Sequence, residues 1–397
     1  MYLRTRITSL TIAIGLVPMI ILGLIGFWVG RVELQKFIRE RLSGVNATKK
    51  AHVIEMYEEM EAKTLTLSTS DLIRKQAPFI TSDALLRTSS AYERATSAIA
   101  QELTLTRQVR DFDDIKILSP KGVVAYVNNQ KYSKDLGTLG NDDIKASFQR
   151  GTAGINFSAP TSDLAEENGI EEILISAPIK NTDGQFLGVI LIEAELSGIV
   201  EEVLDATGLS RTGETVLVYN DNFSALVITP LKFEPNAALT KRIAFDAGNG
   251  TGLQKAAKGE TGSGVTTDYR GVKVMATWDN IPELGWGIET KIDYTEAMSS
   301  LDRVLLYGRW GSLASLILLF LLSEYVVGIF VSSRVKKLRR AAQALADGKP
   351  ATIEPQLMQE HDELGELAIA LHNLSRTSQH GASATADIPS ESPKHHH

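Results

Sequence analysis

Residues 7–30 read ITSLTIAIGLVPMIILGLIGFWVG, a stretch without a charged side chain. A helix of roughly 20 apolar residues crosses the hydrocarbon core of a bilayer, so this stretch predicts a membrane-spanning helix. It runs on into a charged segment instead of ending at a small-residue cleavage site, which indicates an uncleaved anchor with Pro18 inside the span. The stretch decides the architecture, because the polar remainder of the chain must then be tethered to a membrane.

A second apolar run covers residues 310–332 and is followed by a dense basic cluster. Basic residues beside a span stay in the cytoplasm, and Arg4 and Arg6 precede the first span in the same way. We therefore predict a two-pass protein of the bacterial inner membrane, with residues 1–6 in the cytoplasm and residues 31–309 in the periplasm or outside the cell. The basic cluster consists of Arg334, Lys336, Lys337, Arg339 and Arg340.

Glu324 interrupts the second span. A carboxylate near the middle of a membrane costs about 2.5–3.5 kcal/mol on insertion scales, so its side chain is not expected to face lipid. One interpretation is that Glu324 is protonated or lies close enough to the headgroups to reach water. The other is that it lies in a dimer seam and helps to set the rotation of the helix during signalling.

The composition of the chain argues against several classes of function. The chain has 397 residues, of which 43% are hydrophobic and 22% charged, with a formal net charge of -7 and no cysteine. A negative chain without a basic and aromatic stripe is not expected to bind nucleic acid, and disulfides and thiolate metal sites are excluded. His52 is the one histidine in the segment placed outside, so we expect no metal site and no cofactor there. Residues 377–397 lack an apolar period and are expected to form a disordered tail that ends in a tag remnant, residues 395–397.

The segment between the spans begins as a long amphipathic helix. Its apolar residues recur at steps of three, four or their sums, and a second helical pattern covers residues 84–108. After that the period changes to that of strands. The apolar residues of the first helix are Leu34, Ile38, Leu42, Val45, Val53, Tyr57 and Met60.

Two successive sets of strands follow, each with turn residues between its members. In the first set, residues 119–122 (SPKG) and 181–184 (NTDG) carry the serine, proline, asparagine and glycine that tight turns favour. This set predicts a first, distal module over about residues 80–205. The second set predicts a smaller, proximal module over about residues 206–295, with strands at 215–219, 225–228, 265–269, 272–278 and 286–292.

This region resembles a double Cache sensor domain, an α+β fold with a long helix and two PAS-like antiparallel sheets. The resemblance rests on that order of elements and on three segments: 186–190 (FLGVI), 208–215 (GLSRTGET) and 285–288 (GWGI). Double Cache domains occur on chemoreceptors, sensor histidine kinases, cyclic-dinucleotide enzymes and phosphatases. The resemblance therefore implies sensing, and leaves the output open.

The resemblance also implies a ligand pocket in the distal module, near Tyr126, Phe157, Asp163 and Ser176. The alternative is that both aromatic residues are plain core residues and that Asp163 is a solvated loop carboxylate. Double Cache domains that bind amino acids carry a cluster of arginine, tryptophan and tyrosine that this sequence lacks. An amino-acid ligand is therefore not supported, although a small-molecule ligand is expected.

After the second span, two short heptad seams flank an irregular connector, residues 348–361. Two such helices cannot bury their seams alone, so a homodimeric four-helix bundle over residues 333–376 is expected. The arrangement resembles a HAMP domain, and residues 362–367 (DELGEL) match the start of that family's second helix; an ordinary acidic helix start is the alternative. The seams are Val331, Val335, Leu338, Ala342 and Leu345, then Leu364, Leu367, Leu371 and Leu374. The expected relay residues are Glu324, Leu338, Asp362, Glu363 and Gly365.

No catalytic signature stands in the required context. Residues 248–252 (GNGTG) lack the lysine of a phosphate loop and are expected to be a flexible connection, and residues 111–114 (DFDD) are expected to cap the first strand. We expect a non-enzymatic receptor that senses an extracytoplasmic small molecule and signals through HAMP. Its output domain, of histidine kinase, chemotaxis or cyclic-dinucleotide type, would be missing or separate. The alternative is a membrane-anchored regulator or scaffold that acts on a separate cytoplasmic effector.

Overall fold

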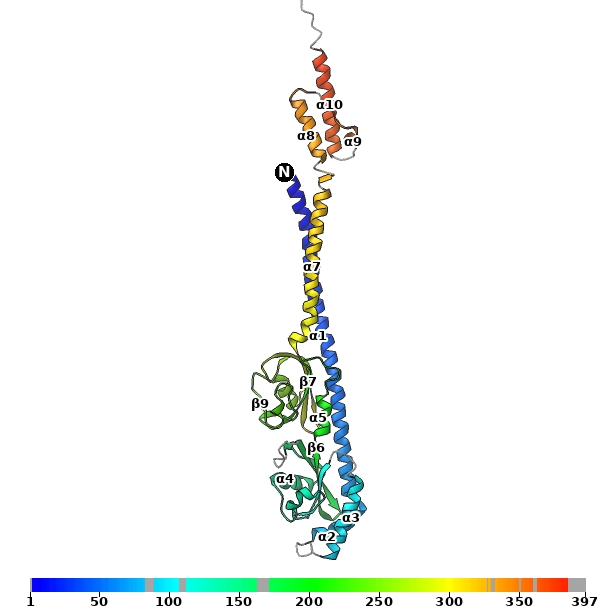
Figure 1. Cartoon of the computed structure of the whole chain (residues 1–397), viewed down its shortest axis with the longest axis vertical. Coiled ribbons are helices and arrows are strands. Elements are labelled where there is room, and N and C mark those ends of the chain that lie inside the picture. Colours follow the sequence, from blue (N-terminus) through cyan, green and yellow to red (C-terminus); the bar gives the residue numbers. More distant parts are fainter. Residues whose placement is uncertain are drawn as a thin grey trace, which may run out of the picture. The chain divides into compact units, whose positions relative to one another are not determined.

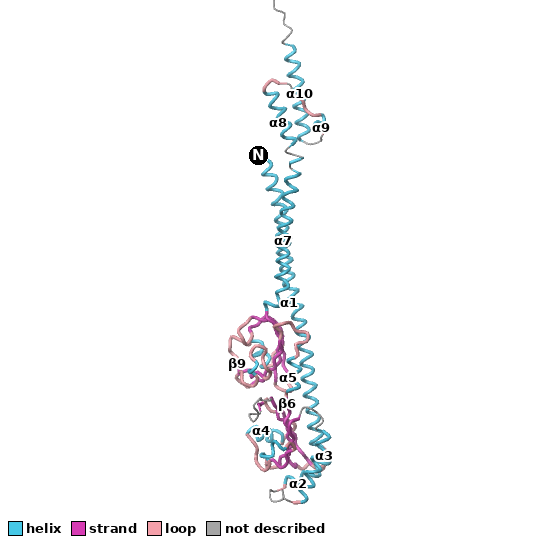
Figure 2. Tube along the Cα trace, in the orientation of Figure 1, coloured by secondary structure: helices cyan, strands magenta, loops and turns pink. Residues whose placement is uncertain are grey.

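The computed structural model describes residues 2–82, 89–106, 112–162, 171–326, 328–329, 333–349, 351–359 and 363–384. These fall into two compact units, one formed by residues 31–300 and the other by residues 1–30 with 301–397. The predicted α+β class with a long N-terminal helix and two antiparallel sheets is confirmed. Figures 1 and 2 show the elements of each unit.

Three helices support the unit of residues 31–300: α1 (Tyr2–Thr69), of which residues 31–69 belong here, α2 (Asp71–Thr81) and α3 (Ser90–Thr106). The sequence pattern did not predict α2 as a separate helix. Ser70 separates it from α1 and caps it, since its Oγ accepts a hydrogen bond from the backbone N of Ile73 at 3.5 Å. Serine is favoured at the N-terminal cap of a helix because its side chain accepts a hydrogen bond from a backbone N–H that the helix leaves unpaired.

The first sheet has the order β2-β1-β6-β5-β3, with β4 also paired to β5, and every pairing is antiparallel. Its strands are β1 (Phe112–Leu118), β2 (Val124–Val127), β3 (Asn156–Phe157), β4 (Thr161–Ser162), β5 (Glu171–Lys180) and β6 (Phe186–Glu195). A 3-10 helix, η2 (Gln130–Asp135), and helix α4 (Asp142–Gly151) lie between β2 and β3 in the chain. This sheet with η2 and α4 is called the first module below.

The two faces of the first sheet pack against different elements because successive strand residues point to opposite sides. One face carries Ile117 and Ile175 and joins Val53 of α1 in a large apolar core. The other face carries Leu118 and Leu191, which pack with Ile144 of α4. The face toward α4 is the one on which polar side chains are also buried.

The second sheet has the order β10-β11-β12-β7-β8-β9 and is also fully antiparallel. Its strands are β7 (Glu214–Asn220), β8 (Ser224–Val227), β9 (Arg242–Ala244), β10 (Gly262–Thr267), β11 (Lys273–Ile281) and β12 (Trp286–Asp293). Helix α5 (Ser197–Leu204) precedes it, and η3 (Pro235–Ala237) and α6 (Thr251–Ala257) lie within it in the chain. This sheet with η3 and α6 is called the second module below.

Helix α6 covers one face of the second sheet, where Leu253 packs with Val216 and Ala276. Residues 248–252 were expected to be a flexible connection. This prediction is wrong for residues 250–252, because Gly250 adopts φ +62° and caps α6, which begins at Thr251. Glycine adopts this conformation without the steric penalty that a Cβ brings.

The other face of the second sheet packs on α1 and on the first turn of α7 (Tyr294–Val326), with Met275 beside Leu42 and Met298. Glu296 fixes that first turn: its carboxylate accepts hydrogen bonds from the backbone N of Arg211 at 3.1 Å and of Thr212 at 2.8 Å, and from the Thr212 hydroxyl. Helix α7 is therefore held by the loop that precedes β7.

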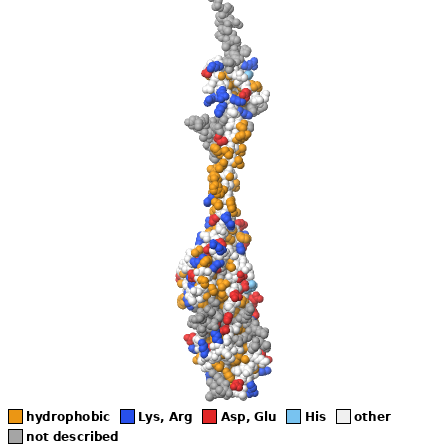
Figure 3. Space-filling view, in the orientation of Figure 1, with side chains coloured by type: hydrophobic (Ala, Val, Ile, Leu, Met, Phe, Trp, Pro, Cys, Tyr) orange, Lys and Arg blue, Asp and Glu red, His pale blue; other side chains and the backbone are white. Residues whose placement is uncertain are grey.

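In the other unit, the described parts of α1 and α7 are two helices long and apolar enough to cross a membrane. None of the residues in their most apolar windows is buried, and Figure 3 shows hydrophobic side chains gathered along α7. A Cβ on Gly15 of α1 would lie 3.1 Å from Leu319 Cδ1 of α7, so the two helices are in close contact there.

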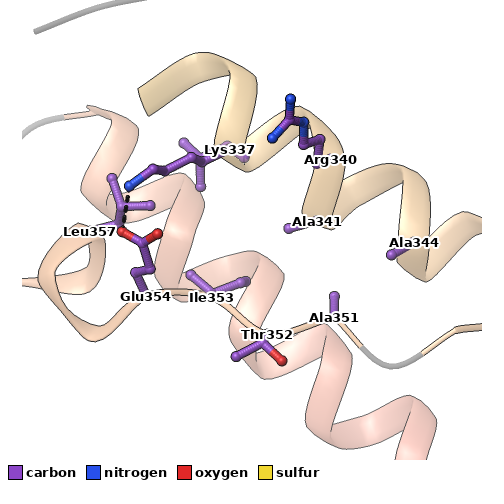
Figure 4. A pocket seen from close by; sticks show the side chains of 10 residues that line it. Lys337, Arg340, Ala341, Ala344, Ala351, Thr352, Ile353, Glu354 and Leu357 are labelled. Atoms are coloured by element: carbon purple, nitrogen blue, oxygen red, sulfur yellow. Dashed lines mark hydrogen bonds and ion pairs between the residues drawn. The ribbon is translucent and has the colours of Figure 1, made fainter. Parts of the chain in front are cut away.

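The same unit holds three further helices: α8 (Ser333–Ala346), α9 (Pro355–Met358) and α10 (Glu363–Ala384). Helices α8 and α10 lie side by side, and the connector between them is not wholly irregular, because it contains the single turn α9. Figure 4 shows Ile353 and Leu357 of this connector beside α8, where Glu354 pairs with Lys337 at 2.6 Å. Leu338, Ile353 and Ala368 belong to one apolar cluster.

Candidate functional site

The first module buries a charged cluster on the face toward α4. The ammonium of Lys116 in β1 is fully buried; it donates to Glu193 Oε1 and lies 3.2 Å from Asp114 Oδ2 and 3.5 Å from Asp135 Oδ2. Burial disfavours the charged ammonium, but the two closest carboxylates outweigh burial and raise the pKa of Lys116. Residues 111–114 were expected to cap the first strand, but this is wrong for Asp113 and Asp114, which lie within β1, and Asp111 lies outside the described residues. Asp114 is a buried member of this cluster and accepts a hydrogen bond from the backbone N of Ile115.

A tyrosine closes the cluster. The Tyr132 ring centroid lies 4.3 Å from the Lys116 ammonium, a distance at which the ring face attracts a cation. The Tyr132 hydroxyl donates to Asp113, and burial together with that carboxylate raises the pKa of Tyr132 above its ordinary value. The cluster therefore holds a neutral phenol, one ammonium and several carboxylates.

The second module buries a similar cluster on the face toward α6. Lys291 Nζ of β12 lies 2.8 Å from Glu214 Oε1 and 2.8 Å from Asp268 Oδ2, and 4.2 Å from the Tyr269 ring centroid. The Tyr269 hydroxyl donates to Glu214 at 3.0 Å. Arg270 adds a second cation at 2.6 Å from Asp268. Burial opposes ionisation of Asp268, but the hydrogen bond and charge of Lys291, followed by the hydrogen bond from Arg270, hold its pKa below the usual value.

Glu289 lies near this second cluster but does not join its ion pairs. Its side chain is fully buried, and neither carboxylate oxygen has a hydrogen-bond partner among the described residues. Burial raises the pKa of Glu289 to about 7, against an ordinary value of 4.5. Helix α6 lies close above it, since a Cβ on Gly252 would come within 1.8 Å of Glu289 Oε1.

A cleft of about 400 Å³ lies between the two modules. The first module contributes Arg150, at the end of α4, and Phe157 of β3. The second contributes Lys258 after α6, the turn between β11 and β12, and Trp286. The ring of Phe157 also packs on Tyr57 of α1, with ring centroids 4.3 Å apart.

The structure does not bring the predicted ligand residues into one described cavity. Tyr126 is buried in the core shared with α1, whereas Ser176 points to the opposite face of the sheet, where it lies against Gly151 of α4. Phe157 lies in the cleft between the modules, and Asp163 lies outside the described residues. Their contact with a ligand stays a prediction.

The predicted relay residues fall in the helices expected to carry them. Glu324 is half-buried in α7. Leu338 of α8 is buried in the apolar cluster that α8 shares with the connector and α10. Glu363 is exposed in the first turn of α10 and Gly365 is buried one turn in, while Asp362 lies outside the described residues.

Sequence reasoning missed the two buried lysines and the cleft. A charged residue inside a strand pattern ordinarily faces solvent, and only the register places Lys116 beside Glu193. Trp286 was noted only as part of a family-like segment, and nothing in the sequence relates it to Arg150.

Neither family models nor curated protein sequences give a match to the chain. Among solved structures, the periplasmic sensory domain of the Campylobacter jejuni chemoreceptor Tlp1 is 14% identical with a TM-score of 0.48, and the match covers 67% of this chain and 98% of that one. The ligand-binding domain of the Pseudomonas aeruginosa amino acid chemoreceptor PctC, solved in complex with GABA, is 13% identical with a TM-score of 0.43, covering 64% and 100%.

A domain described as the extracellular part of a histidine kinase, soHK1S-Z6, is 14% identical with a TM-score of 0.46, covering 68% of this chain and 99% of that one. The likeness concerns the fold alone. In its long helix followed by two antiparallel sheet modules, the chain resembles the sensory domains of chemoreceptors and histidine kinases.

Proposed function

We propose that the chain is a transmembrane receptor that binds a small molecule outside the cytoplasm and relays this event to a cytoplasmic effector. The observation that carries the proposal is the order of elements: two sheet modules stand between two helices that are each apolar enough to span a membrane. A domain fastened at both ends can pass a change in its own packing to two membrane helices.

Charge supports the orientation. The basic residues of α8 follow the second apolar helix, and such clusters remain on the cytoplasmic side. We infer that residues 31–309 face the periplasm or the cell exterior, and that α8 and α10 face the cytoplasm.

The relay is proposed to be a HAMP-type bundle formed by two copies of the chain. In α10, Leu364 and Leu371 pack toward the apolar cluster shared with α8, whereas Leu367 and Leu374 are 47% and 58% exposed. Two exposed leucines seven residues apart form a heptad stripe that a second helix would cover. A homodimer is the arrangement that buries this stripe without another protein.

The mechanism is proposed to be a shift between two packings of the sheet modules. A ligand that prefers one packing by about 1–3 kcal/mol would change the equilibrium usefully. The chain itself is assigned no chemical reaction, and output is assigned to an effector on another segment or another protein.

Cysteine labelling tests the topology, because the chain has no cysteine of its own. Asp183→Cys, in the exposed turn before β6, is expected to react with a membrane-impermeant maleimide in intact cells. Asp347→Cys, after α8, is expected to react only after the inner membrane is permeabilised. Labelling of both positions under the same condition would contradict the receptor.

Charge substitution tests the dimer. The double variant Leu367→Glu with Leu374→Glu is expected to abolish cross-linking between copies in membranes, because four carboxylates would meet in the bundle. Asn373→Glu places a carboxylate on the same helix at an exposed polar position and should leave cross-linking unchanged. Equal cross-linking in both variants would remove the dimer seam from the proposal.

A further inference from the structure

We propose that the cleft between the two modules is the binding site for a small organic carboxylate. This inference rests on the proposed receptor function and names the chemistry of its ligand. Three features of the cleft carry it: its charge, the apolar residues on one side of it, and its position between the modules.

The charge of the cleft is one-sided. Arg150 and Lys258 both line it, and no carboxylate side chain does among the residues that the structure describes. Within the same residues neither cation forms an ion pair, although Lys258 lies over the Phe245 ring at 4.8 Å. Two cations facing one concave surface raise the local concentration of anions, and low-dielectric walls strengthen the effect.

Both cations also stand at the ends of helices, Arg150 in the last turn of α4 and Lys258 at the C-terminal cap of α6. A cation there is favoured by the helix dipole without any ligand. That explanation accounts for each residue alone. It does not require the two helix ends, from different modules, to open into the same cleft.

One side of the cleft is apolar, although Ser158, Asn220, Asn222 and Asn280 also line it. Trp286, Ile281 and Leu284 line it together with Phe157. The Trp286 indole N–H is buried and has no acceptor among the described residues. Because this N–H is not accessible to solvent, Trp286 contributes to the cleft only as part of its apolar side.

The volume and position suit a signalling ligand. A cleft of about 400 Å³ lies within the range typical of small-molecule sites. Trp286 begins β12, and β12 runs directly into α7 at Tyr294. A carboxylate held by Arg150 of the first module and Lys258 of the second would favour one packing of the modules over others.

The test is a binding titration of the full chain in lipid nanodiscs, by calorimetry, with three carboxylates: benzoate, phenylacetate and succinate. The neutral amide of each serves as its partner probe. We expect at least one carboxylate to bind about tenfold or more tightly than its amide, because charge-assisted hydrogen bonds contribute more than neutral ones. That preference should shrink as salt is added.

The variant Arg150→Ala with Lys258→Ala is expected to lose the preference for the carboxylate. The matched control is Lys145→Ala with Lys255→Ala, which removes two lysines from the same helices, since Lys145 pairs with Asp142 on the surface and Lys255 lies over the Trp278 ring. This control should bind as the wild type does. If the first variant does not fold, Arg150→Lys with Lys258→Arg should fold and keep the preference for the carboxylate.

Three results would overturn the site: no carboxylate binds more tightly than its amide, the cleft variant binds as the wild type does, or the control loses binding equally. The cysteine labelling described above separates this failure from that of the receptor. If labelling supports the topology while the cleft variants bind normally, the receptor stands and the ligand site lies elsewhere.

Discussion

Each sheet module buries a lysine–glutamate pair on the same two central strands of its topology, but the two modules place the lysine on opposite members of that strand pair. The strand order β2-β1-β6-β5 of the first sheet matches β8-β7-β12-β11 of the second. In the first module the lysine stands on β1, as Lys116, and its carboxylate on β6, as Glu193. In the second the carboxylate stands on β7, as Glu214, and the lysine on β12, as Lys291.

This inversion shows that the fold accepts the buried pair with either sign on either strand. An unpaired buried ion costs several kcal/mol, whereas either polarity of a pair removes most of that cost. The surroundings do differ. The first cluster has Lys116 as its fully buried cation and the partly exposed Lys131 3.8 Å from Asp113. The second has Arg270 beside Asp268 and the unpaired Glu289 nearby.

The largest expected effect on stability comes from replacing the buried lysine of each module, Lys116 or Lys291. Lys116→Met and Lys291→Met are each expected to cost about 3–5 kcal/mol in the opening free energy of their own module, because buried carboxylates lose their partner. The loss in the second module should be the smaller one, because Arg270 still pairs with Asp268. Hydrogen exchange of the amides in β1 and β6, against those in β7 and β12, measures each module separately.

Lys145→Met, on the surface of α4, is the control and should leave exchange in both sheets unchanged. Equal loss of protection in both modules from either lysine variant would mean that the modules do not open independently.

The second largest expected effect is a pH dependence of the stability of the second module alone. With a folded pKa of about 7 against 4.5, Glu289 stays protonated in the folded chain at pH values where the unfolded chain has lost that proton. Stability is therefore highest below the unfolded value and falls by about 3 kcal/mol as pH rises from 4.5 to about 7. Glu289→Gln should remove this slope from exchange in β7 and β12.

Glu260→Gln, at an exposed position after α6, serves as the control and should keep the slope. A wild-type slope of the opposite sign, or one that Glu289→Gln leaves intact, would show that Glu289 is ionised in the folded protein.

A smaller effect is expected from the close approach of α6 to the second sheet. A Cβ on Gly287 would lie 2.4 Å from the carbonyl carbon of Ala256, so Gly287→Ala must push the helix backbone away. We expect a loss of about 1–3 kcal/mol in the second module, as overpacking costs elsewhere. In the first module, Gly151→Ala meets a serine side chain, Ser176, at 2.7 Å and should cost less.

Gly264→Ala provides the matched control, since its Cβ would meet only a Trp278 ring atom at 3.7 Å. Thermal unfolding of the full chain ranks the three variants, and a Gly287→Ala protein as stable as Gly264→Ala would contradict the close packing.

The smallest expected effect is on the pKa of His52, which contacts α5, the helix between the two modules in the chain. His52 of α1 lies 2.6 Å from Glu202 of α5, and this hydrogen bond with the charge of Glu202 raises the pKa of His52 above 6.5. Glu202→Gln should return the pKa toward that value in an NMR titration of labelled histidine. The pair therefore favours the folded state below pH 6.5 and loses its effect as pH rises through the folded pKa. A His52 titration that Glu202→Gln leaves unaltered would show that the contact is absent in solution.

Local sequence signals predicted the long first helix and the turns of the first module, but not α2, α4 or α6. Gly122 and Gly184 adopt φ +80° in the two predicted turns of the first module, a conformation that glycine tolerates best. The apolar spacing of the long helix also holds, since Leu42, Val53 and Met60 are buried. Both kinds of signal depend on residues within one or two turns of each other, which a single sequence displays.

The buried charges and the cleft depend on residues far apart in the chain. Lys116 and Glu193 are separated by 77 positions, and only strand pairing brings them together. Arg150 and Lys258 come from different modules, so their shared cleft follows from how the modules pack. Heptad spacing predicted the leucines of α10 as one seam, but it could not tell that Leu364 and Leu371 face inward while Leu367 and Leu374 face outward.

The carboxylate of Glu296 fixes the rotation of the first turn of α7 about the helix axis. It accepts from two consecutive backbone amides and a hydroxyl, so the turn cannot swivel about its own axis without breaking all three bonds. Tyr294, at the start of the same turn, accepts hydrogen bonds from Arg31 and Gln35 of α1 at 3.0 Å each. If the second sheet tilted, the first turn of α7 would have to move with it, because these hydrogen bonds join that turn to the loop before β7 and to α1.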